Sequence, residues 1–291
     1  MIPAAFEYSR PGSVDEALAL LVQHAGSAKL IAGGQSLLPL LKLRVASVER
    51  LVDIGRLSEL RGIRDWQGGL SIGALTTYRE VLESDLSKRF PILHEAIIDV
   101  GDVQVRNRGT IGGSIAHADP ASDFPAVAIA LNAQIVLRSK SGERTVSAED
   151  FLQGAFTTAI REDEILTEVR IPAIKGGAGQ AYAKLEQPAS GYSIVGVAAV
   201  ITDVHGVMGS GKIEHVRIGI TGVGDVAYRA KAVEDALMGT QCTEVDIKAA
   251  AEHATDGQTV GTDIHADRTY RTAMAKVYTR RAIEAALHRT P

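Results

Sequence analysis

Short apolar runs and stretches with helical spacing alternate along the chain, and polar or glycine-rich segments separate them. Ser13 and Glu16 have the spacing of a capping box, which predicts a helix running to about residue 24. An apolar run over 28–32 predicts a strand, and alternating apolar positions over 63–74 predict a β-hairpin. Further strands are expected over 2–8, 51–54, 133–137, 143–146, 164–171, 200–205 and 212–221, and further helices after Thr77, over 87–99, after Ser122, and over 229–238, 244–253 and 267–287.

The mixture and order of these elements predict an α+β protein. We expect a first unit over 1–59 and a second over 60–175, because the predicted hairpin opens a new group of strands. The stretch 175–180 is short, rich in glycine and poor in side-chain bulk, so it predicts the boundary of a third unit over 176–291.

Two glycine pairs each follow an apolar run, in Ala32-Gly33-Gly34-Gln35-Ser36 and in Thr110-Ile111-Gly112-Gly113-Ser114. A glycine pair allows backbone N–H groups to approach a bulky anion, and the neighbouring hydroxyl adds a donor. Two such turns can hold one pyrophosphate from both sides. Either pair alone is also compatible with an ordinary tight turn, and neither belongs to a G-x-G-x-x-G fingerprint.

Composition and charge limit the remaining classes of function. The chain has 291 residues and a net charge of −4, with an isoelectric point near 6.1, which gives no electrostatic reason to expect nucleic acid or an anionic membrane as a partner. No apolar run is long enough to span a bilayer and no signal-peptide pattern is present, so we expect a cytoplasmic protein. With Cys242 as its single cysteine, the chain cannot ligate an iron–sulfur cluster, which must then lie on a partner.

The residues around both glycine pairs, 31–44 and 106–123, resemble the flavin-binding segments of the medium subunit of molybdenum hydroxylases, the carbon monoxide dehydrogenase and xanthine dehydrogenase group. The order and spacing of the motifs agree along the whole chain. The resemblance implies an FAD-binding fold of the vanillyl-alcohol oxidase type in two subdomains, followed by a C-terminal α+β domain with a small sheet and helices.

The resemblance also implies roles for individual residues around a bound FAD. Asp123 and Leu166 are assigned to its adenosine end, and Lys184 and Tyr192 to its isoalloxazine ring. Read from the sequence alone, Asp123 is equally suited to cap the helix after Ser122, while Lys184 and Tyr192 read as a strand surface charge and a turn aromatic. The pyrophosphate and ribityl region is assigned to Ala32, Gly33, Gly34, Gln35, Ser36, Thr110, Gly112, Gly113 and Ser114.

Two positions depart from the family pattern. Gln35 stands where carbon monoxide dehydrogenases often carry a histidine, although its amide still donates a hydrogen bond. Gly191 stands where many members carry an acid just before the aromatic residue, which changes the hydrogen bonding expected around Tyr192.

The other polar residues give no separate chemistry. His117, Asp119 and Asp123 lack any recognised spacing of metal ligands, so no metal site is expected. The sequence offers no acid–base dyad or nucleophile, and we expect no catalytic residue on this chain. Cys242 has no neighbouring histidine and is interpreted as a small apolar filler rather than a reactive thiol. Lys42 and Arg44 are compatible with a solvated surface and with a place near phosphate or a partner.

The sequence and the resemblance together favour an oxidoreductase subunit that carries FAD. In that family, FAD passes electrons from 2Fe-2S clusters on a small subunit to an external acceptor (quinone, NAD or oxygen), after a large subunit with the molybdenum cofactor has oxidised the substrate. The usual assembly contains two copies of each subunit, a heterohexamer. The alternatives are a self-sufficient FAD-dependent oxidoreductase of the same fold and a non-redox nucleotide-binding module. The substrate is determined by another chain.

Overall fold

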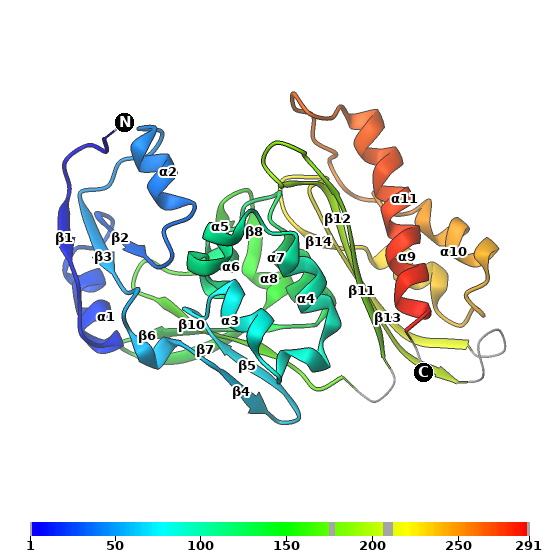
Figure 1. Cartoon of the computed structure of the whole chain (residues 1–291), viewed down its shortest axis with the longest axis horizontal. Helices are drawn as coiled ribbons and strands as arrows, with labels where there is room; N and C mark the ends of the chain where they lie inside the picture. Colours follow the sequence, from blue (N-terminus) through cyan, green and yellow to red (C-terminus); the bar gives the residue numbers. More distant parts are fainter. Residues whose placement is uncertain (1, 175–177, 206–211, 290–291) are drawn as a thin grey trace.

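The structure is a computed structural model that describes residues 2–174, 178–205 and 212–289, so the glycine-rich boundary expected at 175–180 lies partly outside the described residues. Figure 1 shows the chain passing through successive units from the N-terminal sheet (blue) through a central sheet with its helices to a long C-terminal sheet backed by helices (red). The α+β class expected from the sequence is confirmed. Within the described residues, no helix combines the length and the apolar character needed to cross a membrane.

The N-terminal unit is a small parallel sheet with strand order β1-β3-β2, made of β1 (Glu7–Ser9), β2 (Ala28–Ile31) and β3 (Arg50–Asp53). Helix α1 (Val14–Gln23) connects β1 to β2 and buries its apolar stripe against Val52. Its start agrees with the prediction, because the hydroxyl of Ser13 accepts the N–H of Glu16. Helix α2 (Leu37–Lys42) follows β2 after the first glycine pair, and a 3₁₀ turn (Ser58–Leu60) ends the unit.

The central unit is an antiparallel five-stranded sheet in the order β4-β5-β10-β6-β7. The predicted hairpin over 63–74 is confirmed as its β4–β5 pair, and the helix expected over 87–99 is divided, because Pro91 starts a new helix after a 3₁₀ turn (Ser87–Arg89). The strands are β4 (Ile63–Trp66), β5 (Gly69–Gly73), β6 (Gln134–Ser139), β7 (Gly142–Ser147) and β10 (Ile165–Ile171), with a small ladder of β8 (Leu152–Gly154) and β9 (Thr157–Thr158). The helices are α3 (Tyr78–Glu83), α4 (Pro91–Ile98), α5 (Val103–Arg108), α6 (Ile111–His117), α7 (Asp123–Ala130) and α8 (Ala148–Phe151).

The C-terminal unit is an antiparallel sheet in the order β11-β12-β13-β14, lying between two sets of helices (Figure 1). Along β11, Ala181 belongs to the core under α11, whereas its neighbour Tyr182 belongs to the core shared with the central unit. Alternation along the strands therefore gives the sheet two buried faces. The elements are β11 (Gly179–Glu186), β12 (Ser193–His205), β13 (Lys212–Thr221), β14 (Tyr228–Arg229), α9 (Lys231–Leu237), α10 (Glu244–Ala251) and α11 (Arg268–Leu287).

Small residues on the inner face of this sheet bring α7 close to it. Gly219 lies opposite Ala198 on β12, and a Cβ at Gly219 would stand 2.1 Å from the carbonyl oxygen of Ala126 in α7. Every residue of α7 is buried, because the helix packs between this sheet and the central unit. This close contact holds α7 against β12 and β13, and hydrogen bonds join its first residue, Asp123, to polar residues of β11 and β12.

Candidate functional site

The first glycine pair forms the turn expected from the sequence, between the end of β2 and the start of α2. Gly34 has φ +76°, a conformation that favours glycine. The backbone N–H groups of the five residues 33–37 donate to no acceptor within the part of the chain that the structure describes. A run of successive free N–H groups at a turn is a concave donor site for an anion. This turn therefore has the donor geometry that a pyrophosphate requires.

The same turn touches the second glycine segment. A Cβ on Gly33 would lie 2.0 Å from the carbonyl oxygen of Arg108 at the end of α5, and 3.2 Å from Cα of Gly109. Figure 1 shows the chain before α2 approaching α5 and α6 from the N-terminal unit. Gly33 is thus required by the contact between two parts of the protein, so its missing side chain does not leave space for a ligand.

The expectation of a second glycine turn is wrong, because Gly112 and Gly113 lie in the first turn of α6. Thr110 caps this helix, its hydroxyl accepting the N–H of Gly113 at 3.1 Å. The N–H of Gly112 donates to the carbonyl oxygen of Ala74, and a Cβ at Gly112 would lie 2.5 Å from Cβ of Ala74. The glycines here permit close packing, and their N–H groups are already used inside the protein. The segment also carries hydroxyls with partners inside the protein: that of Thr110 caps the helix, and Oγ of Ser114 lies 2.8 Å from Oγ of Ser122.

Asp123 is the centre of a buried polar cluster. Its Oδ1 accepts hydrogen bonds from the hydroxyls of Tyr182 and Ser193, both at 2.6 Å. Its Oδ2 accepts from Nζ of Lys184 at 3.0 Å, and Nζ also donates to the carbonyl oxygen of Asp99 at 2.9 Å. The Lys184 and Asp123 side chains are 3% and 7% exposed, so this ion pair is shielded from solvent.

Burial raises the pKa of Asp123, while the Lys184 ammonium and the two hydroxyl donors act in the opposite direction. Burial and the neighbouring Asp123 carboxylate raise the pKa of Tyr182 well above its usual value, so its hydroxyl stays protonated and acts as a donor. A buried carboxylate with one cation and two hydroxyl donors is the arrangement that compensates for lost hydration.

Two sequence interpretations of this region are corrected. Ser122 occupies the cap position of α7, and Asp123 is the first helical residue, with its carboxylate directed to other strands. Lys184 is buried in an ion pair rather than lying on the surface of its strand. The ion pair thus brings together two residues that the resemblance assigns to different ends of FAD.

The remaining assigned residues differ in their exposure and their contacts. Tyr192 is 46% exposed and directly precedes Ser193, whose hydroxyl donates to Asp123. Leu166 is buried on β10 in the central core. Gln35 is exposed, and its Nε2 donates to the carbonyl oxygen of Gly33 at 3.3 Å.

The structure does not arrange His117, Asp119 and Asp123 as the ligands of one metal ion. His117 Nε2 lies 3.9 Å from Asp119 Oδ2, and the His117 ring packs against that of Phe156, with 5.1 Å between centroids. Burial lowers the pKa of His117 and favours its neutral form. In the described part of the chain, no group of three potential ligands has the arrangement to hold a metal ion.

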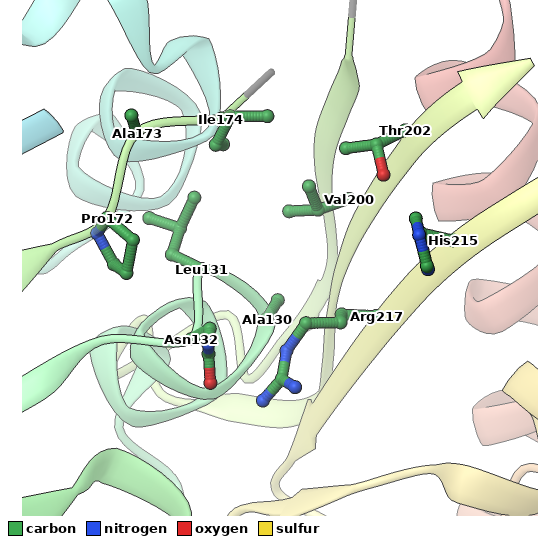
Figure 2. A pocket seen from close by; sticks show the side chains of 10 residues that line it. All are labelled: Ala130, Leu131, Asn132, Pro172, Ala173, Ile174, Val200, Thr202, His215 and Arg217. Atoms are coloured by element: carbon green, nitrogen blue, oxygen red, sulfur yellow. The ribbon is translucent and has the colours of Figure 1, made fainter. Parts of the chain in front are cut away.

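A cavity of about 240 Å³ lies at the other end of α7 (Figure 2). Figure 2 shows Arg217 of β13 directed toward the end of α7, where its guanidinium donates to the carbonyl oxygen of Ile129 at 3.1 Å. The cavity is far along the helix from Asp123 and shares no residue with the glycine segments. Its lining consists of Ala130, Leu131, Asn132, Pro172, Ala173, Ile174, Val200, Thr202, His215 and Arg217.

Sequence reasoning missed Tyr182 and Ser193, the two hydroxyl donors to Asp123. Tyr182 stands two positions before Lys184 on a strand, so both face the same side of the sheet, and Ser193 follows Tyr192 directly. The period of the strand could have placed Tyr182 beside Lys184. It could not have identified Asp123 as the common acceptor.

Both the N-terminal and the C-terminal parts of the chain match known protein families. A family model described as the FAD binding domain in molybdopterin dehydrogenase matches residues 4–174, and another described as the CO dehydrogenase flavoprotein C-terminal domain matches residues 180–286. The chain is 42% identical over 287 residues to the carbon monoxide dehydrogenase medium chain of Hydrogenophaga pseudoflava, with 98% of each chain covered. It is 39% identical over 285 residues to the glyceraldehyde dehydrogenase medium chain of Sulfolobus acidocaldarius, with 98% of this chain and 99% of that relative covered.

Solved structures show the same likeness in three dimensions. A chain of the carbon monoxide dehydrogenase from Hydrogenophaga pseudoflava that lacks the Mo-pyranopterin moiety superimposes with a TM-score of 0.96 at 43% identity, over 100% of both chains. A chain of quinoline 2-oxidoreductase from Pseudomonas putida 86 superimposes with a TM-score of 0.90 at 36% identity, over 99% of both chains.

Proposed function

This chain belongs to the FAD-binding medium subunits of the molybdopterin dehydrogenases, the carbon monoxide dehydrogenase and xanthine dehydrogenase family, and we propose that it is the electron-transfer subunit of a complex of that kind. FAD, when bound, accepts electrons from 2Fe-2S clusters on a small subunit and passes them to an external quinone, NAD or oxygen. A large subunit with the molybdenum cofactor oxidises the substrate. The assembly contains two copies of each subunit.

The observation that carries this proposal is the run of free N–H groups over 33–37, held against the end of α5 by the close approach at Gly33. These groups bind the pyrophosphate, with the hydroxyls of Ser36, Thr110 and Ser114 beside them. The chain thereby anchors and orients its cofactor with backbone donors and hydroxyls. Ala32, Gly34, Gln35, Gly112 and Gly113 shape these two segments.

The ion pair of Asp123 and Lys184 supports placing both residues at one end of FAD. We choose the isoalloxazine end, because Tyr192 precedes Ser193, which donates to Asp123. Leu166 keeps its proposed place beside the adenosine. The proposal also includes a division of the chain into three units, 1–59, 60–175 and 176–291. It includes a cytoplasmic location as well.

The test is a pull-down of the native complex through a tag on this chain, followed by an absorption spectrum and metal analysis. We expect flavin bands, with iron and molybdenum in two additional subunits. Flavin bands on this chain alone, without partners or metals at low salt, would instead favour a self-sufficient FAD-dependent oxidoreductase. A colourless protein that binds no added FAD would contradict both and favour a nucleotide-binding module without redox chemistry.

A further inference from the structure

The polar cluster at Asp123 joins two parts of the protein. Its acceptor stands at the start of α7 in the FAD-binding domain, and its donors Tyr182, Lys184 and Ser193 come from β11 and β12 of the C-terminal unit. Without these donors the buried carboxylate would have no partner within the described residues. The C-terminal sheet therefore completes the surroundings of Asp123.

Close packing on β11 and β12 places the Tyr182 hydroxyl beside Asp123. Gly196 lies opposite Lys184 in the β11–β12 ladder, and a Cβ at Gly196 would stand 2.1 Å from the hydroxyl oxygen of Tyr182. The N–H of Tyr182 donates to Oε2 of Glu95 in α4 at 2.8 Å, which attaches β11 to the central unit. The first contact places the Tyr182 hydroxyl directly beside Gly196, and the second holds the Tyr182 backbone against α4.

Lys184 retains one unused donor. Of the three N–H groups on its ammonium, one donates to Asp123 and one to the carbonyl oxygen of Asp99, and the third has no acceptor among the described residues. A side chain only 3% exposed with an unused charged donor points to an acceptor on a ligand. Under the proposed function, that acceptor is a polar atom of the flavin ring.

We propose that Tyr182 and Ser193 are positioning residues for the flavin: they hold Asp123 as a carboxylate, and Asp123 in turn holds the Lys184 ammonium toward the ring. This inference rests on the proposed function, since it requires FAD at this site. Each hydroxyl contributes one hydrogen bond to Oδ1, and Lys184 alone binds Oδ2. Removal of both hydroxyls leaves Oδ1 without a donor and makes Asp123 easier to protonate.

The consequence is electrostatic. With Asp123 neutral, the charge of Lys184 has no counter-ion, because its other partner is the neutral carbonyl group of Asp99. A cation without its counter-ion favours the flavin that has gained electrons and negative charge. Loss of the hydroxyls therefore shifts the flavin midpoint potential in the positive direction.

The experiment compares Tyr182→Phe, Ser193→Ala and the double variant with a matched control in the purified complex. Tyr228→Phe is the control, because the Tyr228 hydroxyl is also buried in the C-terminal unit but donates to the carbonyl oxygen of Ala254, at 2.8 Å. The readouts are FAD content, the visible absorption band of bound FAD and its midpoint potential. We expect full FAD content in all variants, a positive shift in each single variant at the site and a larger one in the double.

Tyr228→Phe is expected to lower Tm without moving the potential or the absorption band. The inference is overturned if the double variant keeps the wild-type potential while Lys184→Met changes it, or if Tyr228→Phe changes the potential equally. Should the double variant fail to fold, the midpoint potential of Ser193→Ala is compared with those of Lys184→Met and Tyr228→Phe, and the same outcomes apply. A wild-type complex without FAD is a different result and refutes the proposed function itself.

Discussion

Replacing Gly33 by alanine separates the two glycine segments without changing any polar group. The added methyl group would lie 2.0 Å from the carbonyl oxygen of Arg108 and 2.8 Å from its carbonyl carbon. Both atoms belong to the backbone at the end of α5, so no flexible side chain can move aside. The turn over 33–37 and the end of α5 must therefore move apart.

The size of the movement follows from these distances. Non-bonded heavy atoms are in ordinary contact at about 3.5 Å, so a displacement of about 1.5 Å is required. Overpacking of this kind costs roughly 1–3 kcal/mol. FAD binding holds the two segments together, so this cost opposes binding and raises the dissociation constant of FAD roughly 5- to 150-fold.

The assay is FAD content after purification together with a fluorescence titration of the stripped protein with FAD. Gly12→Ala is the control, because its Cβ would meet only Oε2 of Glu16, at an ordinary 3.6 Å. We expect Gly33→Ala to lose FAD during purification and Gly12→Ala to keep it. Equal FAD affinity in Gly33→Ala and wild type would refute the claim that the junction of the two segments forms the cofactor site.

Three further predictions concern stability and reactivity. Asp123→Asn leaves Lys184 buried without a counter-ion and should lower the free energy of unfolding in urea by about 3–5 kcal/mol, whereas a loss below about 1 kcal/mol would contradict a buried ion pair. The Arg144 guanidinium lowers the pKa of Glu164. The wild-type protein should therefore be more stable than Glu164→Gln by its full amount above the unfolded-state pKa of about 4.3, and should lose this advantage as pH falls through the lower folded pKa. A difference in stability that does not depend on pH would contradict this. Burial raises the pKa of Cys242 to about 12, so a thiol reagent at pH 8 should label it slowly in the folded protein and rapidly in denaturant, and equal rates would contradict its burial.

Local signals in the sequence predicted most of the secondary structure. Thr77 and Glu80 form the complete capping box at the start of α3, because both hydrogen bonds depend on residues three positions apart. The β4–β5 hairpin follows from alternation around a glycine turn. These elements need only neighbouring residues to specify them.

Contacts between distant residues account for what the sequence could not predict. Gly112 reads as a turn residue, but it lies in the first turn of α6, and its N–H donates to the carbonyl oxygen of Ala74. Asp123 reads as a cap, but its partners Tyr182 and Ser193 stand about sixty or seventy positions away. Tertiary hydrogen bonds override local preference at such positions, and no spacing rule reveals them.

Amide hydrogen exchange with and without FAD tests the central claim most directly, because the two glycine segments differ in their donors. The N–H groups of residues 33–37 have no acceptor in the described structure, whereas that of Gly112 is bonded to Ala74. We expect FAD to slow exchange strongly over 33–37 and to change it little over 111–114, where exchange is already slow. Unchanged exchange over 33–37 in the FAD-loaded protein would contradict the assignment of this turn as the pyrophosphate site.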